Sequence, residues 1–183
     1  MTNQLLIAMP NLLDPNFHKT VTLICEHNEQ GALGIVINRP LDLQMGEVFE
    51  QMALSSGNDG LNQTPVLDGG PVAKDRGFVL HTDSDKTKWE STIRLPNNVG
   101  VTTSRDILSA LAEGDGPDQA VVALGYAGWD AGQLDAEMAA NAWLTVSATD
   151  EILFDTPFED RWQSAADLLG VNLSQLGPTA GHA

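Results

Sequence analysis

Short apolar segments of strand length, bounded mostly by glycine, proline or asparagine, constrain the fold of this chain more than any other feature. Helical spacing of apolar residues is rarer, so predicted strands outnumber predicted helices by about two to one. Because the two do not alternate regularly, a doubly wound parallel sheet is disfavoured. We predict an α+β domain with a curved, mostly antiparallel sheet and about four helices. The predicted strands are residues 3–9, 20–27, 33–38, 66–67, 77–81, 91–95, 99–102, 120–124, 143–147 and 152–154.

Residues 20–27 and 33–38 are predicted to form a hairpin. Val21, Leu23 and Cys25 alternate with more polar residues, so one strand face is apolar and Cys25 is expected to be buried. A single cysteine excludes an intramolecular disulfide. Burial raises the pKa of a thiol, so a catalytic or redox role for Cys25, with His27 two residues away, is the less favoured interpretation.

Residues 119–144 are the most distinctive stretch, with two of the four tryptophans and the only tyrosine. An apolar strand leads into Gly125-Tyr126-Ala127-Gly128, which we interpret as a tight strand-to-helix turn, followed by a helix capped by Asp130. Along that helix, Gln133, Glu137 and Asn141 share one face. Beside Trp129 and Trp143, this face is either an ordinary solvated surface or the polar wall of a recognition groove.

Two further helices have recognisable start signals. Ser104 is a natural N-cap for residues 105–113. Thr156 is the predicted N-cap, and Pro157 the first helical position, of a last helix. Residues 55–64 are predicted to be a loop. The core positions of the last helix are predicted to be Phe158, Trp162, Ala165, Ala166 and Leu169.

Length and charge limit the functions that this chain can have. Its 183 residues, without an internal linker, predict one domain over residues 1–170 and a flexible tail over residues 171–183. With 25 acidic and 9 basic residues, the net charge is -16, so nucleic acid and anionic lipid would be repelled. No apolar run approaches the ~18 residues of a membrane span, and no basic leader is recognisable, so a cytoplasmic location is expected.

No cofactor or metal site is predicted. The four histidines have no pair at the spacing that one helix face would need, and there is no further cysteine to complete a zinc site. Neither a Walker-type glycine loop nor a Gly-x-Ser-x-Gly motif occurs.

Five motifs occur in a fixed order: FHKTV (17–21), GALGIVINRP (31–40), GGPV (69–72), GFVLH (77–81) and GYAGW (125–129). The last is followed by Gly132-Gln133-Leu134, Glu137 and NAWL (141–144). Together they resemble the AlgH/YqgE family, over about residues 5–170. The resemblance implies a bacterial α+β pseudo-barrel with a bifurcated sheet. Family members are labelled transcriptional regulators or left uncharacterised, and no enzyme activity is established for them.

The resemblance also implies which positions to inspect, without assigning roles. Members are often encoded near a Holliday-junction-resolvase-like protein, which makes such a protein a candidate partner. Asp68 and Glu137 are added because of their places in a turn and on a helix face. The candidate partner or ligand surface is Asn38, Arg39, Asp68, Gly69, Gly70, His81, Trp129, Gln133, Glu137 and Trp143.

Two classes of function follow. The first is a non-enzymatic regulatory or protein-interaction module that binds a partner through the groove near Trp129 and Gln133. The alternative is a small-ligand-binding protein, or an enzyme of unknown reaction, with a pocket near Asp68, Gly70 and His81. Direct DNA binding is disfavoured by the charge and by the lack of a helix-turn-helix.

Overall fold

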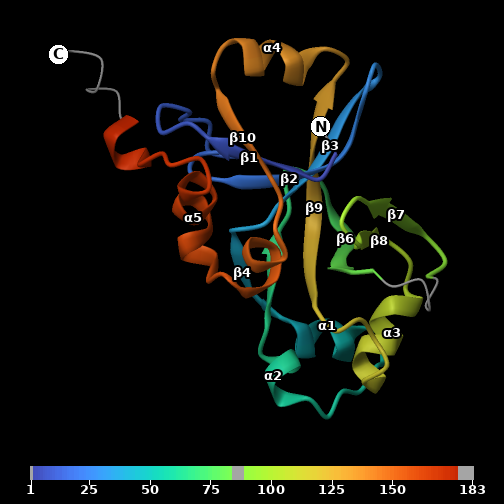
Figure 1. Cartoon of the computed structure of the whole chain (residues 1–183). Helices are drawn as coiled ribbons and strands as arrows, with labels where there is room; N and C mark the ends of the chain where they lie inside the picture. The colour runs from blue at the N-terminus through green and yellow to red at the C-terminus, as the bar shows by residue number, and fades with distance from the viewer. Residues whose placement is uncertain (1, 84–88, 177–183) are drawn as a thin grey trace.

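The computed structural model describes residues 2–83 and 89–176, and ten β-strands account for much of that chain. The strands are β1 (Gln4–Ala8), β2 (Val21–Asn28), β3 (Gly31–Val36), β4 (Pro40–Gln44), β5 (Pro65–Asp68), β6 (Val72–Thr82), β7 (Thr92–Leu95), β8 (Val99–Thr102), β9 (Ala120–Asp130) and β10 (Trp143–Ser147). They form one sheet in the order β10-β1-β2-β3-β9-β6-β8-β7, with β4 and β5 branching from β9. Every pair is antiparallel except β5 with β9, and the sheet curls into a half-barrel (Figure 1).

Five α-helices in the described chain lie around this sheet, and four of them have seven or eight residues. They are α1 (Met45–Gln51), α2 (Asp59–Asn62), α3 (Asp106–Glu113), α4 (Gln133–Ala139) and α5 (Arg161–Asp167). Figure 1 shows α4 at one end of β9 and α1, α2 and α3 gathered at the other end. The predicted α+β fold, with a curved and mostly antiparallel sheet and about four helices, is confirmed. None of the helices in the described chain is long and apolar enough to cross a membrane.

Strand β9 is shared by the two halves of the sheet. Its residues 127–130 pair with β3, and its residues 120–126 pair with β6. On the edge opposite β6, β5 runs parallel to it at Ala123 and Leu124. The connection from β5 to β6 is only three residues long and passes from one edge of β9 to the other. The bifurcation of the sheet therefore occurs at the middle of β9.

The predicted hairpin is formed by β2 and β3, which pair from Asn28 with Gly31 up to Thr22 with Val36. Cys25 is 1% exposed in the largest core cluster, so its predicted burial is confirmed. A second cluster lies under α1 and α3, and a third lies under α4 around Trp129 and Trp143.

The tight turn predicted at Gly125–Gly128 is wrong, because β9 continues through it to Asp130. Gly125 has a φ of +80°, which bends the strand without ending it. Helix α4 begins only at Gln133, after Gly132 with a φ of +76°. Glycine is the usual residue at such backbone angles, in strands as in turns, so its presence alone did not distinguish the two.

Two other local predictions are wrong. The predicted strand 152–154 lies inside a π-helix, Glu151–Asp155, where Thr156 donates hydrogen bonds from both its backbone N and its Oγ1 to the Glu151 carbonyl. Ser104 does not cap α3. Its hydroxyl donates to Asp106 Oδ1 at 2.6 Å, and the helix begins at Asp106.

The C-terminal region also differs from its prediction. Pro157 is extended, a 3-10 turn follows at Phe158–Asp160, and α5 covers Arg161–Asp167, so Leu169 is exposed instead of core. The next 3-10 turn, Leu173–Leu176, buries Leu173 in the main core although it was assigned to the tail. Residues 177–183 of the predicted tail lie outside the described residues. Within the predicted loop 55–64, α2 forms a single turn capped by Asn58.

Candidate functional site

Three glycines of two motifs meet where the β5–β6 connection crosses β9. A Cβ on Gly125 would lie 2.5 Å from the Gly70 carbonyl oxygen. A Cβ on Gly69 would overlap the Gly125 carbonyl, and one on Gly70 would overlap the backbone of Tyr126. Backbone thus passes directly over backbone, and no side chain fits between the two segments. The fold itself requires Gly69, Gly70 and Gly125.

Gly128, in the same motif, is different. Its φ is not in the left-handed region, and the nearest atom to an added Cβ would be Cε2 of Tyr126 at 3.5 Å, an ordinary contact. Neither the backbone conformation nor the packing requires glycine here. Gly128 is exposed, and its missing side chain leaves space above the sheet.

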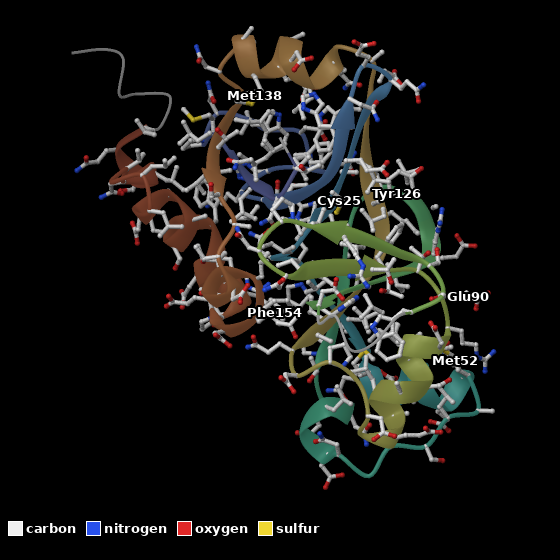
Figure 2. All side chains as sticks on the ribbon, turned by 45° about the vertical axis from the view of Figure 1, so that its right-hand side comes forward. Cys25, Met52, Glu90, Tyr126, Met138 and Phe154 are labelled. Carbon is white, nitrogen blue, oxygen red and sulfur yellow. The ribbon has the colours of Figure 1, made fainter. Side chains whose placement is uncertain are left out.

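That space is part of an open cavity of about 450 Å³, which we call the tyrosine hollow. It combines residues from three of the sequence motifs with residues of β2. Figure 2 shows Tyr126 beside β9 where the ribbon of β6 begins. The hollow is lined by Glu26, Asn28, Gln30, Gly31, Ala32, Leu33, Val72, Tyr126, Gly128, Trp129 and Asp130.

The strand register determines which face of the sheet carries the hollow. Glu26 pairs with Leu33, and Leu33 pairs with Gly128, so these three residues share one face. The neighbouring row of the register, which contains His27 and Trp129, belongs to the other face, and that face is covered by α4. The hollow and α4 therefore lie on opposite sides of the β2–β3–β9 sheet.

The hollow has an acidic rim. Glu26 and Asp130 are exposed, and no basic side chain is among the described residues that line it. Val72, at 39% exposure, adds apolar surface. The ring of Tyr126 is fixed by an edge contact with Phe78, with 5.8 Å between ring centroids. Carboxylates beside an aromatic ring and an apolar patch suit a basic side chain with a long aliphatic stem.

On the opposite face, the structure brings together four of the predicted site residues as the tryptophan cluster, Trp129, Gln133, Glu137 and Trp143. Both indole N–H groups donate to Glu137 Oε1, at 3.3 Å from Trp129 and 3.1 Å from Trp143, and Gln133 Nε2 donates to Oε2 at 3.0 Å. The two rings are only 5% and 3% exposed. The aromatic surfaces therefore face inward, and Gln133 is the exposed member.

Two further contacts complete this cluster. Phe17 stacks on Trp129, with 5.9 Å between centroids, and meets Trp143 edge-on at 5.5 Å. Gln133 Oε1 accepts a hydrogen bond from the backbone N–H of Asp130 at 3.0 Å, which ties the end of β9 to α4. Phe17 was not among the predicted site residues, although it lies in the first motif. The cluster thus fixes the strand end that carries the rim residue Asp130.

Asn38 and Arg39 hold the loop before β2 against the sheet. Asn38 accepts from the Val21 N–H and donates to the Lys19 carbonyl, both at 2.9 Å. Arg39 donates to the carbonyls of residues 16 and 18, at 2.8 and 3.0 Å. These bonds position the loop that carries Phe17. Asn38 and Arg39 are not among the residues that line the tyrosine hollow.

The structure does not bring Asp68 and His81 together. Asp68 pairs with Leu124, whereas His81 pairs with Ala120 on the opposite edge of β9, four residues away in register. Asp68 accepts a hydrogen bond from Gly70 N at 3.3 Å. Asp68 and His81 therefore lie on opposite edges of β9.

His81 and Cys25, which the sequence analysis considered as possible functional groups, are both buried and make contacts inside the fold. The His81 ring contacts the Thr82 carbonyl at 2.9 Å and Thr102 Oγ1 at 2.7 Å, and burial lowers its pKa. Burial raises the pKa of the Cys25 thiol to about 12, and the charge of Glu26 adds to this shift. Within residues 2–83 and 89–176, no group of three or more His, Cys, Asp or Glu side chains is placed to hold a metal ion.

A second cavity, of about 480 Å³, lies between α1, α3 and the middle of β6. Its walls are mainly apolar and include Leu43, Val48 and Leu108, with Asp75 and Arg105 among its polar residues. Arg105 donates to the Met52 carbonyl at 2.6 Å. No candidate residue predicted from the sequence lines this cavity.

The fold and the hollow together define a class of protein: a small α+β half-barrel with an open, acidic hollow beside a backbone crossing made of glycines. Within that class the chain belongs to the AlgH-like family, whose sequence model matches residues 5–174. The resemblance inferred from the five motifs is thereby confirmed.

Relatives and solved structures agree with this assignment. A UPF0301 protein of Xanthomonas campestris is 51% identical over 183 residues, covering 100% of this chain and 96% of the relative. One of Thioalkalivibrio sulfidiphilus is 56% identical over 182 residues, with the same coverage. The solution structure of the AlgH protein from Pseudomonas aeruginosa matches with a TM-score of 0.79 at 50% identity, over 99% of this chain and 95% of that chain.

A crystal structure of a protein from Corynebacterium diphtheriae shares the fold alone. It matches with a TM-score of 0.75 at 19% identity, over 96% of this chain and 91% of that chain. The family consists of uncharacterised proteins, so function has to be argued from the site.

Proposed function

We propose that this protein is a non-enzymatic, cytoplasmic interaction module that acts by binding a partner protein, and that the tyrosine hollow is its contact site. The observation that carries the proposal is Gly128. The fold does not require a glycine there, and the missing side chain keeps the hollow open. Three motifs contribute residues to this same hollow, which supports a role beyond packing.

The charge of the molecule supports a basic partner. The net charge of -16 attracts basic surfaces at long range and repels phosphate backbones. At short range, Glu26 and Asp130 on the rim would pair with Lys or Arg. Nucleic-acid-binding proteins present such basic surfaces. A Holliday-junction-resolvase-like protein therefore stays a candidate partner, and any effect on transcription would pass through the partner instead of direct DNA contact.

The tryptophan cluster has a positioning role in this proposal. Its rings are buried and its carboxylate already accepts three hydrogen bonds, so it offers little free surface to a partner. Through Gln133 it holds Asp130 in place at the rim. Cys25 and His81, the two residues considered for catalysis from the sequence, are buried and do not line the hollow, which supports a non-enzymatic role.

Co-purification from the native host tests the proposal. The double variant Glu26→Gln/Asp130→Asn removes both rim charges, and we expect it to lose at least about nine-tenths of the partner recovered with wild type, because two charge-assisted contacts are lost. The matched control, Glu50→Gln/Glu113→Gln, removes two exposed charges at the other end of β9 and should keep the partner. Equal recovery with both variants, each shown to be folded, would exclude the hollow as the contact site.

A second candidate function is favoured by the apolar cavity between α1 and α3, whose size suits a small ligand. Native mass spectrometry of the protein from its host would then show a bound small molecule. Leu108→Trp would fill the cavity and release that molecule. A protein that carries no added mass and does not bind an apolar fluorescent dye would rule out this second candidate.

A further inference from the structure

The end of β9 next to the tyrosine hollow is an open strand edge. Strand β6 pairs with β9 only as far as Tyr126, opposite Val72, the first residue of β6. Beyond Tyr126, residues 127–130 pair with β3 alone. On the side where β6 lies, no strand of the described chain therefore covers this last part of β9.

The free backbone groups of this edge can be identified. The N–H of Asp130 donates to Gln133 Oε1, so it does not point toward β3. Backbone groups of alternate residues in a strand point to the same edge. Tyr126, Gly128 and Asp130 therefore present their N–H and C=O groups to one side, and Tyr126 is the last of them opposite β6. The N–H and C=O of Gly128, an exposed residue, lie next along the open edge.

We propose that an extended, basic peptide segment of the partner adds to this edge as a short strand and places Arg or Lys side chains in the tyrosine hollow. This inference rests on the proposed function and names the chemistry of the partner segment. Main-chain hydrogen bonds to an exposed sheet edge supply affinity in this mode of recognition, and alternate side chains supply specificity.

The face of the sheet explains why the segment is basic. A peptide residue opposite Gly128 points its side chain to the face of the hollow, where glycine leaves the surface free. An arginine stem can lie across Gly128 and Leu33, with its guanidinium directed toward Glu26 and Asp130. Tyr126 borders the same surface. The exposed Gly128, the acidic rim and the free strand edge could thus all contact one basic peptide.

Synthetic peptides and the full-length protein test this mode directly. The probe is a fluorescein-labelled hexapeptide of alternating Arg and Val, followed by fluorescence anisotropy. In an added strand that runs antiparallel to β9, arginines that face the hollow carry the backbone N–H groups that face β9, so N-methylation of the arginines should weaken binding roughly ten-fold or more. N-methylation of the valines should leave the affinity within about two-fold, because those N–H groups face away from β9. A Glu-Val hexapeptide controls for charge.

Hydrogen exchange gives a second readout. We expect the Gly128 amide to exchange fast in the free protein and to be protected when the arginine peptide is bound. If the peptide binds but both N-methylated forms bind equally well and Gly128 stays unprotected, the strand addition is wrong, while a basic ligand in the hollow survives. If the arginine peptide binds no better than the glutamate peptide, and Glu26→Gln/Asp130→Asn has no effect on the native partner, the proposed function fails as well.

Discussion

Gly125 and Gly128 are only three residues apart, but they are constrained differently, and this difference can be measured. Gly125→Ala would put a side chain on a residue whose φ is +80°, and its Cβ would lie 2.5 Å from the Gly70 carbonyl oxygen. We expect it to reduce the free energy of unfolding by about 2–4 kcal/mol. Gly128→Ala has room for its methyl group and should change stability by less than about 0.5 kcal/mol.

Urea denaturation of the two alanine variants checks this prediction, and Gly77→Ala, where an added Cβ meets no atom within 4 Å, serves as a control. A Gly128→Ala variant as unstable as Gly125→Ala would show that Gly128 is needed by the fold. That outcome would also remove the observation on which the proposed contact site depends.

At the scale of single residues, the sequence predicted which side chains gather but not how they are turned. The spacing of Gln133 and Glu137 beside two tryptophans correctly grouped these four residues, because i, i+4 positions share one helix face. The two tryptophans are also covered by Phe17, which the distant loop before β2 places against both rings. A tertiary contact of this kind leaves no periodic signal in the sequence.

At the scale of elements, β9 illustrates where local patterns stop being informative. Its apolar first half was predicted as a strand, and its second half, which contains Gly125 and Gly128, was predicted as a turn. Gly125 is needed because the β5–β6 connection crosses the strand there, and this contact with a distant segment cannot be read from the local sequence. Likewise, the apolar triplet 152–154 fits a strand or a helix equally well by itself, and it became a π-helix. Nor did the sequence reveal the hollow, because its residues come from β2, β3, β6 and β9.

At the scale of the whole molecule, the charge of -16 predicts opposite salt effects on stability and on binding. The described chain has only two ion pairs within 4.0 Å, His27 with Asp135 and Arg94 with Asp83, so screening removes more repulsion than attraction. Raising NaCl from low concentration to about 0.3 M should therefore increase the free energy of unfolding by about 1 kcal/mol, or the melting temperature by about 2–4 °C. Over the same range the affinity for the arginine peptide should fall several-fold, because its contacts with Glu26 and Asp130 are screened. Differential scanning fluorimetry and anisotropy on the same samples measure the two effects, and salt effects of the same sign would contradict this account of the charge.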